Sequence, residues 1–106
     1  MTNLTADFEL TPQTTLIQGL WIDLGSRVEK DSSWLRIEWL IENRLHLIVQ
    51  QSREVGSLYR SPQDDRLWHY YLTAPQLGDS SPPSLEQINA TQAAELFGNL
   101  QRESQS

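Results

Sequence analysis

The chain has 106 residues and a formal net charge of −6, and it contains no cysteine. A chain of this length is the size of one domain with one hydrophobic core. The absence of cysteine excludes disulfides and thiolate metal ligands, and it fits a reducing compartment. The excess of fourteen acidic over eight basic residues argues against direct binding of nucleic acid, because neutralising phosphates requires a basic face.

The two ends of the chain differ from its middle. The start, MTNLTADFEL, lacks the basic and apolar regions of a secretory signal, and no apolar run approaches the ~20 residues of a membrane helix. We therefore expect a cytoplasmic protein that does not bind a membrane. Residues 1–14 and 99–106 are polar and are expected to be a flexible amino-terminal segment and a disordered tail, so residues 15–98 form the predicted domain.

The first predicted element is a hairpin. LIQGLWID, residues 16–23, reads as a strand in which Gly19 is a candidate bulge, and LGSR turns the chain into a second short strand near Val28.

One long helix is predicted over DSSWLRIEWLIENRLHLIVQQ, residues 31–51, and Asp31 or Ser32 can cap its start. The main apolar stripe at helical spacing consists of Trp34, Ile37, Ile41, Leu45 and Ile48. Trp39, Leu40 and Leu47 make a second flank apolar. This helix is expected either to be clasped between two layers or to expose a patch to a partner.

A second hairpin is predicted after the helix. The strand VGSLYR, residues 55–60, is followed by the turn SPQDD and by the strand RLWHYYLT, residues 66–73. The alternation of a strand places Trp68, Tyr70 and Leu72 on one face. The other face then carries Leu67, His69 and Tyr71.

The last third of the domain predicts a loop, a strand and a short helix. APQLGDSSPPS has the composition of a loop, and SLEQI, residues 84–88, is expected to add an edge strand. In NATQAAELFG, Asn89 and Gln92 form a capping box and Gly98 ends the helix. The predicted fold class is therefore α+β, with a small antiparallel sheet of two hairpins packed on one long helix and a short C-terminal helix.

Acidic, basic and aromatic groups gather in SPQDDRLWHYY, residues 61–71. An acid-base centre would need His69 near Asp64 and Asp65, but an extended strand separates them by more than ~13 Å. We therefore interpret the stretch as a turn that feeds a strand. His46 and His69, the two histidines, show no metal-ligand spacing, and no nucleophile motif or phosphate loop is present. The sequence thus predicts no catalytic residue, metal site or cofactor.

Several motifs occur together in a recognisable order. They are GLWID at 19–23, RIEWLIENRL at 36–45, LYRSPQDDRLW at 58–68, PPSLEQI at 82–88 and AAELFG at 93–98. From about Leu16 to Gly98, the chain resembles immunity protein family twenty-seven of bacterial polymorphic toxin systems. The matching residues are Trp21, Arg36, Tyr59, Arg60, Pro62, Asp64, Arg66, Trp68, Pro82 and Pro83. Two departures are Asp65 in place of a glycine and Asp79, Ser80 and Ser81 in place of a glycine run.

The resemblance implies a non-enzymatic α+β protein that neutralises a cognate toxin domain by occluding it. The acidic net charge suggests a basic toxin, such as a nuclease, because opposite charges speed association. Hairpin tips and loops are where binding residues concentrate. The predicted patch comprises Arg60, Asp64, Asp65, Arg66, Leu67, His69, Tyr71, Asp79, Pro82 and Pro83.

Two other interpretations stay open at this level. The chain could be an orphan structural or regulatory domain, in one version a homodimer through Trp39, Leu40 and Leu47 on the far flank of the long helix. It could also be a small hydrolase that uses Asp64, Asp65 and His69. The interpretation of residues 61–71 as a turn followed by a strand argues against this alternative.

Overall fold

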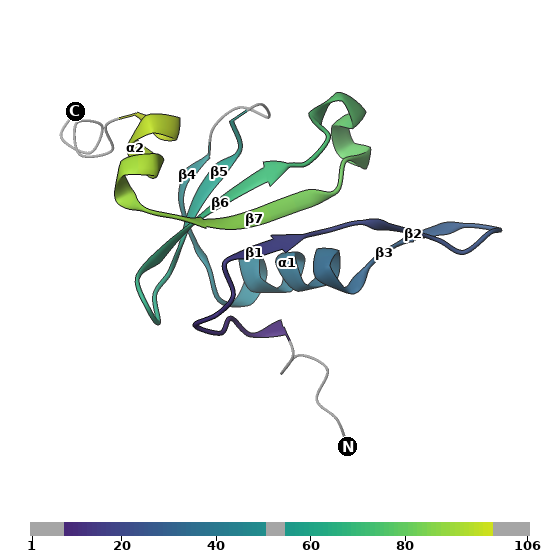
Figure 1. Cartoon of the computed structure of the whole chain (residues 1–106), viewed down its shortest axis with the longest axis horizontal. Coiled ribbons are helices and arrows are strands. Elements are labelled where there is room, and N and C mark those ends of the chain that lie inside the picture. Colours follow the sequence, from purple (N-terminus) through teal and green to yellow (C-terminus); the bar gives the residue numbers. More distant parts are fainter. Residues whose placement is uncertain (1–7, 51–54, 99–106) are drawn as a thin grey trace, which may run out of the picture.

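The computed structural model describes residues 8–50 and 55–98, and it shows a five-stranded antiparallel sheet between two helices (Figure 1). The α-helices are α1 (Ser32–Asn43) and α2 (Ala90–Phe97), and a 3-10 helix, η2 (Pro75–Ser80), lies within the segment that was predicted to be a loop. The strands are β1 (Leu16–Gln18), β2 (Trp21–Asp23), β3 (Val28–Lys30), β4 (His46–Gln50), β5 (Ser57–Ser61), β6 (Arg66–Leu72) and β7 (Pro83–Ile88). The main sheet has the order β1-β7-β6-β5-β4, and β2 and β3 form a separate two-stranded sheet. The predicted α+β class with antiparallel pairing is confirmed.

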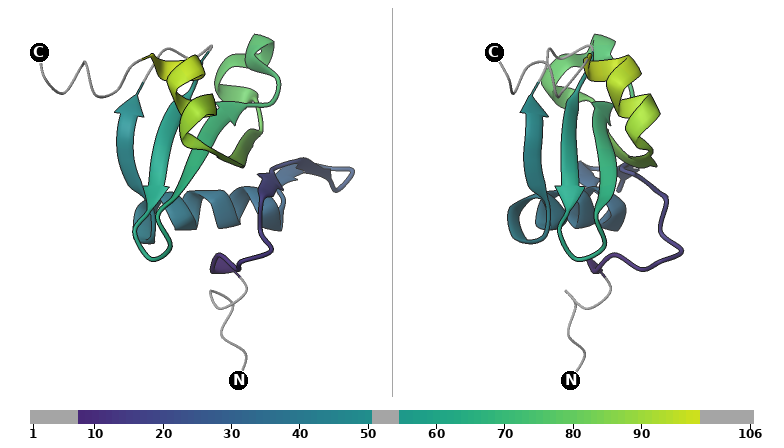
Figure 2. Two further views of the ribbon diagram at one scale, coloured as in Figure 1. Left: turned by 60° about the vertical axis from the view of Figure 1, so that its left-hand side comes forward. Right: turned by 90° about the vertical axis from the view of Figure 1, so that its left-hand side faces the viewer.

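The two helices cover opposite faces of the main sheet (Figure 2). Along β6, Trp68 and Tyr70 belong to the cluster under α1, whereas Leu67 packs against the cluster under α2. The buried residues on the α1 side are Ile17, Ile37, Leu40, Leu45, Trp68 and Leu85. Those on the α2 side are Leu58, Ile88, Ala93 and Phe97. The predicted alternation of side chains along β6 is therefore confirmed, and it separates the two clusters of the core.

The helix predicted over residues 31–51 is wrong in its second half, because α1 has 12 residues and ends at Asn43. The backbone N–H groups of Arg44 and Leu45 both donate to the carbonyl of Leu40, at 2.8 and 2.9 Å, and close the last turn. Residues His46–Gln50 then form β4, which pairs with β5. No glycine or proline marks this end, and the β-branched Ile48 and Val49 favour a strand once β5 offers hydrogen-bond partners.

The apolar flank predicted for the long helix is also wrong. Leu40 is fully buried in the α1 core, and Leu47 lies on β4 with 51% of its surface exposed. Trp39 is covered in part by Phe8, with ring centroids 6.1 Å apart, and by the guanidinium of Arg44. Trp39, Leu40 and Leu47 therefore do not form the helix surface that we considered for a homodimer. Self-association stays a prediction, but this surface cannot mediate it.

Strand β7 is an interior strand, which corrects the prediction of an edge strand. It lies between β1 and β6, with Leu85 opposite both Ile17 and Tyr70. The predicted strand over residues 16–23 is divided at Gly19. Its first part, β1, pairs with β7 in the main sheet, and its second part, β2, pairs with β3. The N–H of Gly19 donates to the carbonyl of Pro83 at 2.8 Å. Gly19 therefore marks a crossing between two sheets, whereas the sequence suggested a bulge.

The β2–β3 hairpin, residues 20–30, projects from the domain as an arm (Figure 1), and every residue in it is exposed. Asp31 fixes its base, because one carboxylate oxygen accepts the N–H groups of Leu20 at 3.0 Å and Trp34 at 2.9 Å. The same side chain is the N-cap of α1, which decides between the two predicted candidates, Asp31 and Ser32. At the other end of the domain, the predicted capping box of Asn89 and Gln92 is present at the start of α2.

None of the described helices is long and apolar enough to cross a membrane. The predicted division of the chain at residues 14 and 98 stays a prediction, since residues 1–7 and 99–106 lie outside the described part.

Replacement of Gly19 by alanine should lower the free energy of unfolding. A Cβ atom there would lie 3.0 Å from Cβ of Trp34 and 3.1 Å from Cδ of Pro83, and such overpacking costs about 1–3 kcal/mol. Urea denaturation of Gly19→Ala measures the loss. Gln18→Ala, an exposed neighbour on β1, should change stability little, and equal stability of the two variants would contradict the close approach.

Candidate functional site

The stretch between β5 and β6 is a turn, as predicted. The N–H groups of Asp64 and Asp65 point back to the carbonyl of Ser61, at 3.3 and 2.8 Å. Asp65 has a φ of 58°, in the left-handed region that glycine adopts most readily. His69 does not join the aspartates, because its Nε2 atom lies 2.6 Å from the carbonyl oxygen of Val55. The acid-base centre considered for a hydrolase is therefore not assembled.

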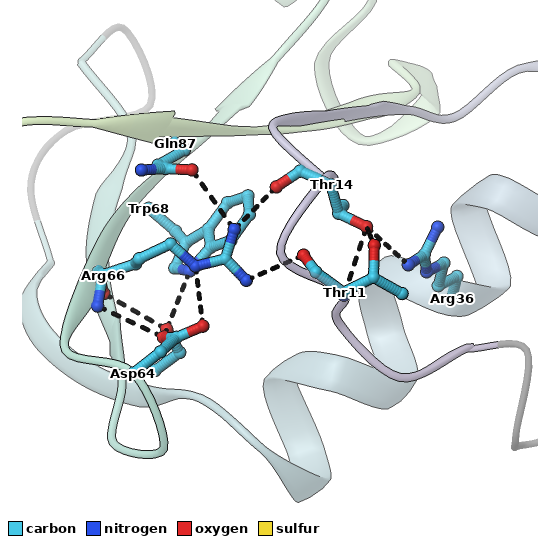
Figure 3. A network of polar contacts seen from close by, with 8 residues as sticks. Thr11, Thr14, Arg36, Asp64, Arg66, Trp68 and Gln87 are labelled. Carbon is cyan, nitrogen blue, oxygen red and sulfur yellow. Dashed lines mark hydrogen bonds and ion pairs between the residues drawn. The ribbon is translucent and has the colours of Figure 1, made fainter.

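The Arg66 guanidinium ties the turn to the amino-terminal segment and to β7 (Figure 3). It donates to Asp64 Oδ2 at 2.7 Å, the Thr14 carbonyl at 2.7 Å, the Thr11 carbonyl at 3.1 Å and Gln87 Oε1 at 3.2 Å. The side chain of Arg66 is only 13% exposed. Arg66 therefore acts as a structural clamp, although the predicted patch placed it on a binding surface.

Asp64 connects this clamp to the core. The hydroxyl of Ser61 donates to Asp64, and the indole Nε1 of buried Trp68 donates to the same hydroxyl oxygen at 3.1 Å. Partial burial works against ionisation of Asp64, but hydrogen bonds from Ser61 and Arg66 and the charge of Arg66 hold the pKa of Asp64 below its ordinary value of 3.8. The aspartate–arginine–tryptophan motif that carries the family resemblance is thus an internal network.

Two further arginines hold residues 8–14 against α1. Arg36 donates to the carbonyls of Phe8 and Glu9 at 3.0 and 2.8 Å, and burial lowers its pKa. Arg44 forms a two-point pair with the Glu9 carboxylate, at 2.8 and 2.5 Å. Hydrogen bonding to Arg44 lowers the pKa of Glu9. The segment before β1 is therefore attached mainly by guanidinium groups, and these arginines serve the fold.

The loop before the double proline packs against the base of the arm. Ser81 is buried, its Oγ accepts the N–H of Ala74 at 2.9 Å, and its φ of −73° is open to any residue. The indole Nε1 of Trp21 donates to the carbonyl of Ser80 at 2.9 Å. Ser81 therefore needs no glycine, although it stands where the family pattern has one. The side chain of Asp79 lies outside the described part of the chain.

The predicted patch falls into separate regions. The turn with Asp64 and Asp65 precedes β6 and the loop with Pro82 and Pro83 follows it, so the two lie at opposite ends of that strand (Figure 1). Arg60 pairs with Asp65 at the exposed turn, and Pro83 is buried. Leu67, which the predicted patch included, packs against the core cluster under α2. Among these residues, the structure brings His69 and Tyr71 together in one groove.

This β7–α2 groove is our candidate functional site. It lies between strands β6 and β7 and helix α2, with a volume of about 330 Å³. The groove is lined by His69, Tyr71, Glu86, Ile88, Gln92, Glu95 and Leu96. The His69 ring contacts Tyr71, with centroids 4.7 Å apart, and meets the edge of Phe97 at 5.6 Å. The packed rings give the groove a firm aromatic floor.

Two carboxylates face this floor without a cationic partner. Among the described residues, neither Glu86 nor Glu95 takes part in an ion pair. Burial raises the pKa of the Tyr71 hydroxyl, and the negative charge of Glu86 raises it further. A groove with an aromatic floor and carboxylates that lack an ion pair is suited to binding a positively charged group.

Sequence reasoning missed five of the seven lining residues, Glu86, Ile88, Gln92, Glu95 and Leu96. A signal was present, because Gln92, Glu95 and Leu96 follow the three- and four-residue spacing of one helix face. Glu86 follows the buried Leu85, so alternation puts it on the other face of β7. No group of three or more histidine, aspartate or glutamate side chains within the described residues could hold a metal ion.

Comparison with known proteins gives one family match. The model of the family described as Immunity protein 27 matches residues 23–89, well over half of the chain. No curated protein and no solved structure gives a match.

Replacement of Arg66 by lysine should destabilise the fold although it keeps the charge. An ammonium group cannot reproduce a guanidinium that reaches four acceptors from a nearly buried position, and we expect a loss of about 2–3 kcal/mol. Arg60→Lys is the matched control, because its pair with Asp65 has side chains 42% and 80% exposed. Chemical denaturation of both variants tests the difference, and a loss in the control as large as in Arg66→Lys would contradict it.

Stability should fall in acid through Asp64. Its pKa is lower in the folded chain than in the unfolded chain, so its stabilising effect is complete above the unfolded value and is lost as pH falls through the folded value. Thermal unfolding from pH 7 down to about 3 should therefore show decreasing stability below about pH 4. Asp64→Asn should be less stable at neutral pH and should depend less on pH. The same acid dependence in both proteins would rule out this origin.

Proposed function

The chain belongs to the immunity protein 27 family, and on that premise we propose that it neutralises a cognate toxin domain by binding it and covering its working surface. A toxin-neutralising role in general follows from the family. Binding without chemistry is supported by the state of the reactive side chains. Asp64 and Asp65 are engaged by arginines, and His69 lies against the Val55 carbonyl.

The β7–α2 groove is the surface that we propose for the toxin. It is a concave site next to exposed apolar area, since Leu96 at its rim is 41% exposed. Aromatic side chains in a desolvated pocket, surrounded by polar groups, are the usual anchors of protein interfaces. The groove combines His69 and Tyr71 with the carboxylates of Glu86 and Glu95, and this combination is the observation that carries the choice.

A basic toxin domain fits the charge of the chain. The net charge of −6 favours a positively charged partner, because complementary potentials steer the encounter and disfavour partners of like charge. Nucleases are one class with such a surface, since they bind phosphate groups through lysine and arginine. We therefore propose that the partner is a basic toxin domain, with a nuclease as its first candidate.

A titration of toxin activity tests the proposal. The cognate toxin domain is assayed with increasing amounts of the full chain, and activity should fall linearly to zero near one equivalent. Size-exclusion chromatography should show a complex that contains both proteins, and co-expression should restore growth. An unrelated basic nuclease should be unaffected.

Two results would oppose the proposal in different ways. A chain that forms no complex and gives no rescue is not an inhibitor of that toxin. Inactivation by far less than one equivalent would indicate turnover, and it would replace occlusion by an enzymatic mechanism.

A further inference from the structure

We propose that the β7–α2 groove receives one arginine side chain of the bound partner, held between the carboxylates of Glu86 and Glu95 over the rings of His69 and Tyr71. This inference rests on the proposed function, and it names the chemistry that the groove recognises.

The described part of the chain offers no free cation for the charges of the groove. Each lysine or arginine within residues 8–50 and 55–98 already has internal partners. Five of them form the pairs Arg27–Glu29, Lys30–Glu38, Arg44–Glu9, Arg60–Asp65 and Arg66–Asp64, and Arg36 is bound to backbone carbonyls. Glu86 and Glu95 are left without a cation on the described chain. A positively charged side chain would complement both.

The geometry of the walls favours a group that can bind from two sides. Glu86 belongs to β7 and Glu95 to α2, so the carboxylates belong to different walls of the groove. A guanidinium presents several N–H donors in one plane and can reach two acceptors at once, whereas an ammonium acts as a point charge. Because the acceptors come from two elements, arginine matches the groove better than lysine.

The floor and the size of the groove agree with this assignment. His69 is set by its contact with the Val55 carbonyl and by the rings of Tyr71 and Phe97. Guanidinium groups stack on aromatic faces. Ile88 and Leu96 supply apolar area for the methylene stem. The volume of about 330 Å³ lies at the lower end of small-ligand sites, ~300–1,000 Å³, and so suits a side chain.

The test measures the affinity of the full chain for its cognate toxin domain. Glu86→Gln and Glu95→Gln keep shape and remove charge, so each should weaken binding about 10-fold or more, as expected for loss of a charged hydrogen bond. Glu42→Gln is the matched control, since Glu42 is exposed on α1 and also lacks an ion pair on the described chain. The control should bind like the wild type, and thermal unfolding should show that all three variants fold.

A mutant cycle then identifies the partner group. Each arginine of the toxin is replaced in turn, and one replacement should lose its effect when Glu86 and Glu95 are both glutamine. An equal effect of every toxin arginine in both backgrounds would overturn the inference.

Three other outcomes have separate meanings. Unchanged affinity of both groove variants, in a complex that the wild type forms, would overturn this inference and leave the proposed function standing. No complex with the wild-type chain would overturn both. Arg53 and Arg102, which lie outside the described part, are competing occupants. If Arg53→Gln or Arg102→Gln shifted the NMR signals of His69 and Tyr71 in the free protein, the groove would bind its own chain and the inference would fail.

Discussion

The described fold depends on the hydrogen bonds of one guanidinium group. Arg66 stands where the turn enters β6, and it reaches the amino-terminal segment, the turn and β7 from a nearly buried position. Its guanidinium also lies over the ring of Trp68, 4.8 Å from the centroid, and Trp68 is the largest fully buried side chain. A buried cation is costly unless its donors are satisfied. The segments that supply the acceptors must therefore come together for this charge to be tolerated.

This role changes the meaning of the residues that carry the family resemblance. Asp64, Arg66 and Trp68 form an internal network, Arg36 holds the segment before β1, and Pro83 is buried. These residues account for a common scaffold. The groove between β7 and α2 is built mainly from other positions, so a family could keep the network and vary the partner. The exposed residues of that groove, more than the shared motif, are where we expect specificity to lie.

Local signals in the sequence were sufficient wherever a few neighbouring residues decide the structure. Asp31 and Asn89 cap helices because their side chains meet N–H groups three residues on, and the turn before Arg66 follows from Pro62 and the aspartates. The end of α1 could not be predicted in this way, since the apolar residues after Asn43 fit a helix until β5 supplies a strand partner. The groove escaped prediction for the same reason. Glu86 and Glu95 line the same groove only after β7 and α2 pack together.

The arm formed by β2 and β3 stands apart from this tertiary support. Leu20, Ile22 and Leu24 are all exposed, and neither strand pairs with the main sheet. A lone two-stranded ribbon is marginally stable in water, so the arm depends on contacts at its base. These include the Asp31 carboxylate, the contacts of Trp21 with Trp34 and the Ser80 carbonyl, and the Lys30–Glu38 pair. Amide protons in the arm should consequently exchange with solvent through local opening, whereas those of β6 should exchange only through global unfolding. The main sheet and its two α-helices therefore unfold as one cooperative unit, whereas the β2–β3 arm can open locally while the rest of the domain stays folded.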